Sequence, residues 1–227
     1  MIIGNGLIAQ SFYRNFGDDS NVVIFASGVS NSHEIHSEAF CRERHMLVEA
    51  LHCRKKLVYF STCSIDDPEM QKSPYVIHKK EMELLVHSAN DYAIFRLPQV
   101  VGRSSNPNTL TNYLYQQITS GSAFTVWRHS RRNLIDVDDV ALIVRYFIKV
   151  LSVNRITLNV ASPFSVSITE LVSTFELILG KQANYVIIEA GGAYLIDSDS
   201  ANEAAVQMGI DFNGAYIERL IRKYYGE

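Results

Sequence analysis

The segment Ser73-Pro74-Tyr75-Val76-Ile77-His78-Lys79-Lys80-Glu81 decides what this 227-residue chain is expected to be. Proline is favoured in the first turn of a helix, so we predict a helix that begins at Pro74. Tyr75 and Lys79 are four residues apart and therefore lie on the same face of that helix. A phenol has an ordinary pKa of about 10, and a neighbouring ammonium favours its ionised form. The pair is therefore suited to moving a proton on or off an alcohol or carbonyl oxygen. The alternative is a surface tyrosine beside a solvated lysine.

The polar segment Ser61-Thr62-Cys63 lies a short way upstream and directly follows a strand-like run, residues 56–60. Ligands bind at the carboxyl ends of the strands in open parallel sheets. The Thr62 hydroxyl is therefore expected to share a substrate oxygen with Tyr75.

A glycine turn lies near the start of the chain, in Gly4-Asn5-Gly6-Leu7-Ile8-Ala9, after the short apolar run Met1-Ile2-Ile3. It precedes a helical stretch that extends to about Phe16. Backbone N–H groups and the helix dipole at such a turn can hold a phosphate. An ordinary turn of an α/β protein is the alternative interpretation.

Strand-like and helical segments alternate along the chain. Continuous apolar runs are typical of parallel strands buried on both faces, and the segments between them have helical spacing. We therefore predict an α/β fold with a Rossmann-like, doubly wound parallel sheet and a smaller lobe late in the chain. Asp138 and Asp139 are interpreted as acids at a helix N-terminus, and residues 167–170 and 200–203 as capping boxes. The expected strands are 22–26, 56–60, 92–97, 123–127 and 156–160, and the expected helices are 34–53, 75–88, 110–119, 140–151 and 215–225.

The composition excludes several classes of function. The chain has 21 Lys and Arg against 24 Asp and Glu, which gives a net charge of −3. This charge does not indicate binding to nucleic acid or to an anionic membrane. No apolar run is long enough for a membrane span, and we expect a cytoplasmic protein. The cysteines Cys41, Cys53 and Cys63 are odd in number and lack metal-ligand spacing, so we expect neither a disulfide framework nor a metal site. All three are expected to be at least partly buried.

Six of these segments occur in the order typical of the extended short-chain dehydrogenase/reductase family, which the chain resembles. That family comprises NAD(P)-dependent epimerases, dehydratases and reductases that act on nucleotide sugars. The segments are the glycine turn 4–9, the strand 22–26, Ser61-Thr62, Ser73-Pro74-Tyr75 with Lys79 and Glu81, Arg96-Leu97-Pro98-Gln99-Val100-Val101-Gly102, and Arg132-Asn133-Leu134-Ile135-Asp136-Val137-Asp138-Asp139.

The resemblance implies roles for individual residues. Thr62 and Tyr75 would bind the reacting oxygen, with Ser61 as the alternative to Thr62, while Lys79 would hold the nicotinamide ribose. Arg132 would reach the diphosphate of a nucleotide-sugar substrate, for which a bidentate guanidinium is chemically suited. The other implied residues are Gly4, Asn5, Gly6, Leu7, Ile8, Ala26, Ser27, Gly28 and Pro98 for NAD or NADP, and Cys63 and Gln99 for the substrate.

The chain also departs from the family pattern. Members usually have further strands between the first helix and the strand matching 22–26, but only residues 17–21 fill that interval here. The missing strand normally ends in the acid that binds the adenosine ribose. The adenosine half of the site is therefore expected to be reduced, and the choice between NAD and NADP stays open. The glycine triplet is also incomplete, with Ile3 and Ala9 at its ends.

The reaction is narrowed by the residues after Thr62. Dehydratases of this family have Asp-Glu there, whereas this chain has Cys63 and Ser64, which argues against dehydration. Ketoreduction and C4-type epimerisation need only Thr62, Tyr75, Lys79 and a nicotinamide. Epimerisation by proton abstraction, with Cys63 as one base, is a less favoured version. A non-catalytic member that has lost cofactor binding is the alternative from another class.

The expected organisation follows the resemblance. Residues 1–103 and about 134–152 are assigned to a shortened cofactor domain, and about 104–133 and 153–227 to a substrate-binding lobe. A homodimer is expected through the helices at 34–53 and 75–88.

Overall fold

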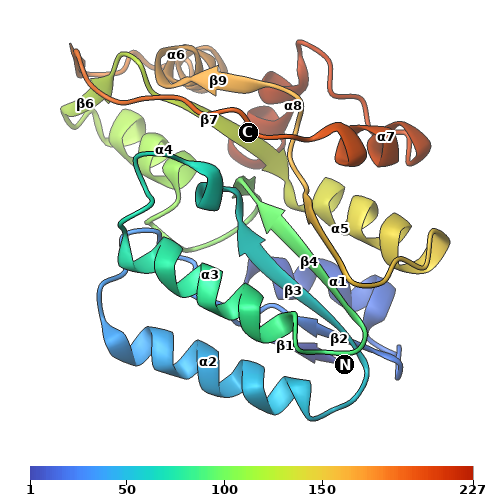
Figure 1. The fold of residues 1–227 in the computed structure, drawn as a ribbon. Coiled ribbons are helices and arrows are strands. Elements are labelled where there is room, and N and C mark those ends of the chain that lie inside the picture. The colour runs from blue at the N-terminus through green and yellow to red at the C-terminus, as the bar shows by residue number, and fades with distance from the viewer. Residues whose placement is uncertain (227) are drawn as a thin grey trace.

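The computed structural model describes residues 1–226, and its main sheet has five strands in the order β1-β2-β3-β4-β8 (Figure 1). Every neighbouring pair in this sheet is parallel. The carboxyl ends of all five strands therefore lie at the same edge of the sheet. The strands are β1 (Ile2–Ile3), β2 (Val22–Phe25), β3 (Lys56–Thr62), β4 (Tyr92–Leu97) and β8 (Ile156–Asn159).

Helices cover both faces of this sheet, because successive strand side chains point to opposite faces and both sets are apolar. Val23 and Phe25 pack in the cluster under α2 and α3. Val22 and Ile24 pack in the larger cluster that includes α1 and α5. The predicted doubly wound α/β fold is therefore confirmed. The helices are α1 (Leu7–Phe16), α2 (Ser37–Leu51), α3 (Pro74–Val86) and α5 (Val137–Arg145).

Strand β1 lies at the edge of the sheet. It pairs only with β2, Ile2 opposite Ile24 and Ile3 opposite Phe25. Only residues 17–21 connect α1 to β2. Within residues 1–226 no strand lies beyond β1, which matches the shortening expected from the sequence.

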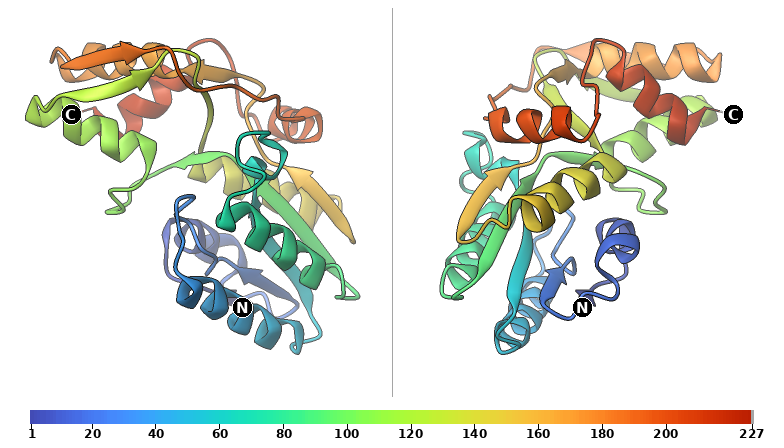
Figure 2. Two further views of the ribbon diagram at one scale, coloured as in Figure 1. Left: turned by 60° about the vertical axis from the view of Figure 1, so that its left-hand side comes forward. Right: turned by 90° about the vertical axis from the view of Figure 1, so that its right-hand side faces the viewer.

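A lobe lies above the edge where the strands of the main sheet end, and the arrowheads of β3 and β4 point towards it (Figures 1 and 2). It contains a three-stranded sheet in the order β5-β7-β9 and a two-stranded parallel sheet of β6 and β10. The lobe comprises β5 (Gln99–Val101), α4 (Leu110–Ser120), β6 (Phe124–Trp127), β7 (Arg131–Asp136), β9 (Ser165–Ser167), α6 (Ile168–Leu179), β10 (Tyr185–Ile188) and α8 (Tyr216–Tyr225).

The strands cross the sequence-based domain division in three places. Strand β5, within 1–103, and residues 134–136 of β7 are assigned to the cofactor domain, but they pair with each other in the sheet of the lobe. The division also assigns residues 153–227 to the lobe, but β8 (Ile156–Asn159) pairs with β4 and is the fifth strand of the main sheet. The sequence of β8 predicts a strand, but its partner β4 is distant in the chain, so the local pattern alone did not reveal which sheet it joins.

Of the three helix starts predicted from acids or capping boxes, two agree with the structure and one differs. Ser167 and Glu170 form the predicted capping box of α6. Asp138 and Asp139 lie in the first turn of α5, which continues as a π-helix, η2 (Tyr146–Val150). The capping box predicted at residues 200–203 is wrong, because α7 (Asp199–Gln207) begins after Ser198 and has no side-chain cap.

The cysteines are only partly as predicted. Cys63 is buried, whereas Cys41 and Cys53 are exposed rather than partly buried. No helix within residues 1–226 combines the length and apolar character that crossing a membrane requires.

Candidate functional site

The residues singled out in the sequence gather at the carboxyl edge of the main sheet. Thr62 is the last residue of β3, and Gly4, Ala26 and Pro98 directly follow β1, β2 and β4. The short 3₁₀-helix η1 (Cys63–Asp66) connects this edge to α3. Figure 2 shows the same edge facing the lobe. The parallel sheet therefore brings together segments that are far apart in the chain.

Tyr75 and Lys79 lie on the buried face of α3. The helix begins at Pro74, and the Ser73 side chain caps it by accepting a hydrogen bond from Val76 N. Tyr75 is 7% exposed and Lys79 is 2% exposed, and the Lys79 Nζ lies 5.9 Å from the centre of the Tyr75 ring. The interpretation of a surface tyrosine beside a solvated lysine is therefore wrong.

The polar contacts of Lys79 were not anticipated from the sequence. Its Nζ donates to Glu43 Oε1 at 2.9 Å and to the Tyr59 hydroxyl at 3.2 Å. Glu43 comes from α2, and Tyr59 comes from β3, three residues before Thr62. Lys79 is therefore held between helix α2 and strand β3, the strand that ends at Thr62.

Glu43 is completely buried and accepts several hydrogen bonds. The Tyr59 hydroxyl donates to Oε1 at 2.6 Å, Val29 N donates to Oε2 at 2.6 Å, and His78 Nε2 lies 3.0 Å from Oε2. Burial opposes ionisation of the carboxyl. The Lys79 ammonium and these hydrogen bonds outweigh burial, so the pKa of Glu43 lies well below its ordinary value of 4.5.

This depressed pKa predicts a pH dependence of stability. A carboxyl whose pKa is lower in the folded state stabilises the protein above its unfolded pKa, and this contribution is lost as the pH falls through the folded value. We expect the free energy of unfolding of the wild type to exceed that of Glu43→Gln at pH 7, and the difference to shrink below pH 4.5. Urea unfolding of both proteins from pH 7 to pH 3 measures this. A difference that stays constant across that range would contradict the prediction.

Gly28 lies directly against the Lys79–Glu43 pair. A Cβ at residue 28 would come within 2.6 Å of Lys79 Nζ and 2.9 Å of Glu43 Oε1. A side chain at residue 28 would therefore force Lys79 Nζ or Glu43 Oε1 to move from its present position. The sequence placed Gly28 in the cofactor site, and the structure places it beside Lys79.

The three residues at the end of β3 differ in their surroundings. Thr62 Oγ1 accepts from Ser64 N at 3.1 Å and so caps η1. The Ser61 hydroxyl is buried and finds no partner among the described residues. Cys63 Sγ donates to Arg96 O at 3.4 Å, and burial raises the pKa of the thiol. A protonated thiol is a poor base, which argues against the proton-abstraction role considered for Cys63.

The glycine turn has the form of a phosphate-binding turn. Gly4 has φ +122°, and a Cβ there would lie 2.4 Å from Ala26 O, so only glycine fits. Gly6 precedes α1 in open space, and no side chain caps that helix. The first N–H groups of α1 are therefore left for another acceptor, as a diphosphate requires. Asn5 is exposed, Leu7 and Ile8 are half-buried, and Ser27 Oγ contacts Met46 Sδ at 3.6 Å.

The predicted substrate residues come partly from the end of β3 and partly from the lobe. Arg132 is half-buried in β7, and Gln99 opens β5. Tyr194, which the sequence analysis did not single out, lies close enough to Cys63 and Arg132 to interact electrostatically, and burial raises its pKa to about 12. Arg131 N donates to Gly192 O, which ties the segment before Tyr194 to β7. No local pattern marks Tyr194, because it lies in an irregular segment.

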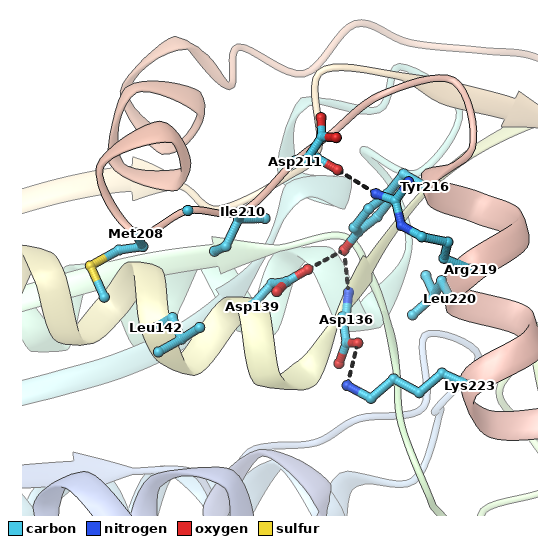
Figure 3. A pocket seen from close by; sticks show the side chains of 11 residues that line it. Asp136, Asp139, Leu142, Met208, Ile210, Asp211, Tyr216, Arg219, Leu220 and Lys223 are labelled. Carbon is cyan, nitrogen blue, oxygen red and sulfur yellow. Dashed lines mark hydrogen bonds and ion pairs between the residues drawn. The ribbon is translucent and has the colours of Figure 1, made fainter.

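A separate pocket lies between α5 and α8, and its polar groups are paired with one another (Figure 3). The Tyr216 hydroxyl donates to Asp139 Oδ2 at 2.7 Å and accepts from Asp136 N at 2.9 Å, and Lys223 Nζ donates to Asp136 Oδ2 at 2.7 Å. These contacts fasten α8 to the start of α5. Within residues 1–226 no group of three or more His, Cys, Asp or Glu side chains could hold a metal ion.

Comparisons with known structures give one consistent fold. UDP-glucuronic acid 4-epimerase from Bacillus cereus, solved with UDP-glucuronic acid and NAD, is 16% identical, with a TM-score of 0.71 over 99% of this chain and 88% of that chain. The Bordetella bronchiseptica enzyme WbmG, solved with NAD and UDP, is 15% identical, with a TM-score of 0.69 over 96% and 76%. RMD from Pseudomonas aeruginosa, complexed with NADPH, is 16% identical, with a TM-score of 0.67 over 97% and 84%.

Sequence comparisons match a smaller part of the chain than the structural comparisons do. No curated protein sequence matches this chain. The family model of the NAD-dependent epimerase/dehydratase family matches residues 22–161, which include Thr62, Tyr75 and Lys79 but not the glycine turn. This match covers more than half of the chain. The chain therefore belongs to the NAD-dependent epimerase/dehydratase family.

Proposed function

We propose that this protein transfers hydride at a sugar carbon of a nucleotide sugar, either in ketoreduction or in C4-type epimerisation, with Thr62, Tyr75 and Lys79 as its catalytic residues. The observation that carries the proposal is the buried Tyr75–Lys79 pair on α3, next to the β3 strand that ends at Thr62. A buried lysine beside a tyrosine at a ligand-binding edge has a chemical use that a surface pair lacks.

The cofactor site fits a nicotinamide nucleotide. The uncapped start of α1 and the glycine turn suit the diphosphate, while Ala26, Ser27, Gly28 and Pro98 line the same edge. When bound, the nicotinamide supplies or accepts the hydride at the sugar carbon. Neighbouring structures carry NAD or NADPH, and either nucleotide is compatible with this proposal.

The chain's own residues would handle the proton and the substrate. In ketoreduction the Tyr75 hydroxyl donates a proton to the carbonyl oxygen as hydride reaches the carbon, and Thr62 holds that oxygen by a hydrogen bond. Epimerisation runs the same step in both directions with rotation of the ketone between them. Arg132, with Ser61, Cys63 and Gln99, would bind the nucleotide sugar from the lobe side. UDP-sugars are suitable first substrates to test, because structures similar to this chain were solved with UDP-glucuronic acid or UDP-glucose bound.

A second candidate is a binding module that keeps the fold and has lost cofactor binding. The edge position of β1 favours it, because no described strand supplies the adenosine side of the site. The retained Thr62, Tyr75 and Lys79 favour the enzyme.

A titration separates the two candidates. We expect purified protein to bind NADH or NADPH, followed by nicotinamide fluorescence, and expect Lys79→Met to bind the same nucleotide more weakly. Failure of the wild type to bind either nucleotide up to millimolar concentration would reject the enzyme proposal in favour of the binding module.

The assembly and location remain predictions. On the two helices expected at the dimer contact, Leu47 is in the core, Met46 and Leu85 pack against it, and Leu84 of α3 is 69% exposed. A monomer in sedimentation at micromolar concentration would reject the homodimer. A cytoplasmic location stays a prediction.

A further inference from the structure

A carboxylate occupies a position of α2 where an apolar residue is expected. Glu43, Leu47 and Ala50 follow helical spacing on the buried face of that helix, and Glu43 is 0% exposed. Glu38 and Glu49 of the same helix are exposed. An unpaired charge is costly to bury, so Glu43 can lie on this face only because other groups pair with it.

The partners of Glu43 come from three different segments. Oε1 receives hydrogen bonds from Tyr59 of β3 and Lys79 of α3, and Oε2 receives one from Val29 N in the loop after β2. His78 of α3 also faces Oε2. One carboxylate therefore ties together the loop, the strand and the helix that surround the Lys79 ammonium.

These contacts leave Lys79 with little freedom. An ammonium has three N–H donors, and two of them are taken by Glu43 Oε1 and the Tyr59 hydroxyl. Gly28 lies against the same nitrogen and would displace it if it carried a Cβ. One N–H therefore remains for a bound ligand, and its direction is set by the other two.

We infer that Glu43 is the positioning residue of Lys79, aiming its one remaining N–H at the hydroxyls of a bound nicotinamide nucleotide. This inference rests on the function proposed above, and it assigns Glu43 no contact with substrate or cofactor. Catalytic and binding groups need supporting residues that hold their side chains in place. Here the support is a buried charge pair with a second hydrogen-bonded anchor, Tyr59.

The inference predicts a particular pattern in a double-mutant cycle. Glu43→Gln keeps the shape of the side chain but removes its charge, and we expect about tenfold weaker NADH or NADPH binding, the size expected for losing one hydrogen bond to a charged group. In a Lys79→Met background, Glu43→Gln should not weaken nucleotide binding any further, because no ammonium remains to be positioned. Nicotinamide fluorescence gives all four dissociation constants, and melting curves establish that each variant is folded.

Glu83→Gln is the matched control. Glu83 is also a buried carboxylate, on the same helix as Lys79, but it pairs with Arg96 through two hydrogen bonds of 2.9 and 2.8 Å. The Glu83→Gln variant should be less stable than the wild type but should bind the nucleotide with unchanged affinity. If Glu43→Gln does not fold, Glu43→Asp replaces it, because its shorter side chain cannot hold both Lys79 and Val29 N and should also weaken binding.

Three results would overturn the inference. One is wild-type affinity in folded Glu43→Gln or Glu43→Asp, and another is losses that multiply in the Glu43→Gln/Lys79→Met double variant. Either result, with binding that still depends on Lys79, would leave the proposed function intact. A wild type that binds neither NADH nor NADPH would instead overturn both.

Discussion

Tyr75→Phe should lower kcat/KM by about 10²–10⁴-fold, the contribution typical of a positioned general acid or base. The substitution removes the hydroxyl that would transfer the proton and leaves the ring. The ring packs with Val29, Ile65 and Val76, and these apolar contacts are kept in the variant. The variant should therefore stay folded and still bind the nicotinamide nucleotide.

The measurement is steady-state turnover of whichever UDP-sugar the wild type converts, with melting curves and nucleotide titration of the same preparations. Tyr92→Phe is the control, since Tyr92 is also 7% exposed but begins β4, at the opposite end of the sheet from the site. Full activity in a folded Tyr75→Phe variant would exclude the proton-transfer role.

Lys79→Met should destabilise the protein by about 3–5 kcal/mol, because it leaves the Glu43 carboxylate buried without its counter-charge. For a chain of this size, this corresponds to a fall in melting temperature of roughly 6–20 °C. Adding Glu43→Gln to Lys79→Met should recover part of the loss, since the double variant buries no unpaired charge.

Lys80→Met provides the control for this effect. Lys80 is the next residue of α3, exposed, and hydrogen-bonded only to Gln71 among the described residues. Exposed polar contacts contribute little, so the melting temperature should change by no more than a few degrees. Calorimetry or thermal circular dichroism gives the melting temperatures of the wild type, Lys79→Met, the Glu43→Gln/Lys79→Met double variant and Lys80→Met. Equal melting temperatures for Lys79→Met and Lys80→Met would show that the buried pair does not stabilise the fold.

Local patterns in the sequence were enough to predict most of the fold. The apolar runs of β2, β3 and β4 and the helical spacing of α2 and α3 each depend on residues within one segment. The start of α3 at Pro74 placed Tyr75 and Lys79 on one face, and the end of β3 placed Thr62 at the ligand-binding edge. These features follow from helix and strand geometry, which is why the sequence revealed them.

Contacts between distant segments were decided by tertiary structure alone. Glu43 and Lys79 are 36 residues apart, and a glutamate in a helix is usually a solvated charge, so nothing local marks it as a buried anchor. The pairing of β8 with β4 and the approach of Tyr194 to Cys63 likewise arise only when the sheet and lobe are assembled. The sequence by itself thus determined which residues carry the expected chemistry, because helix and strand periodicity is local. Only the packed structure decided which groups hold Lys79 in place, because burial and ion pairing depend on elements brought together from across the chain.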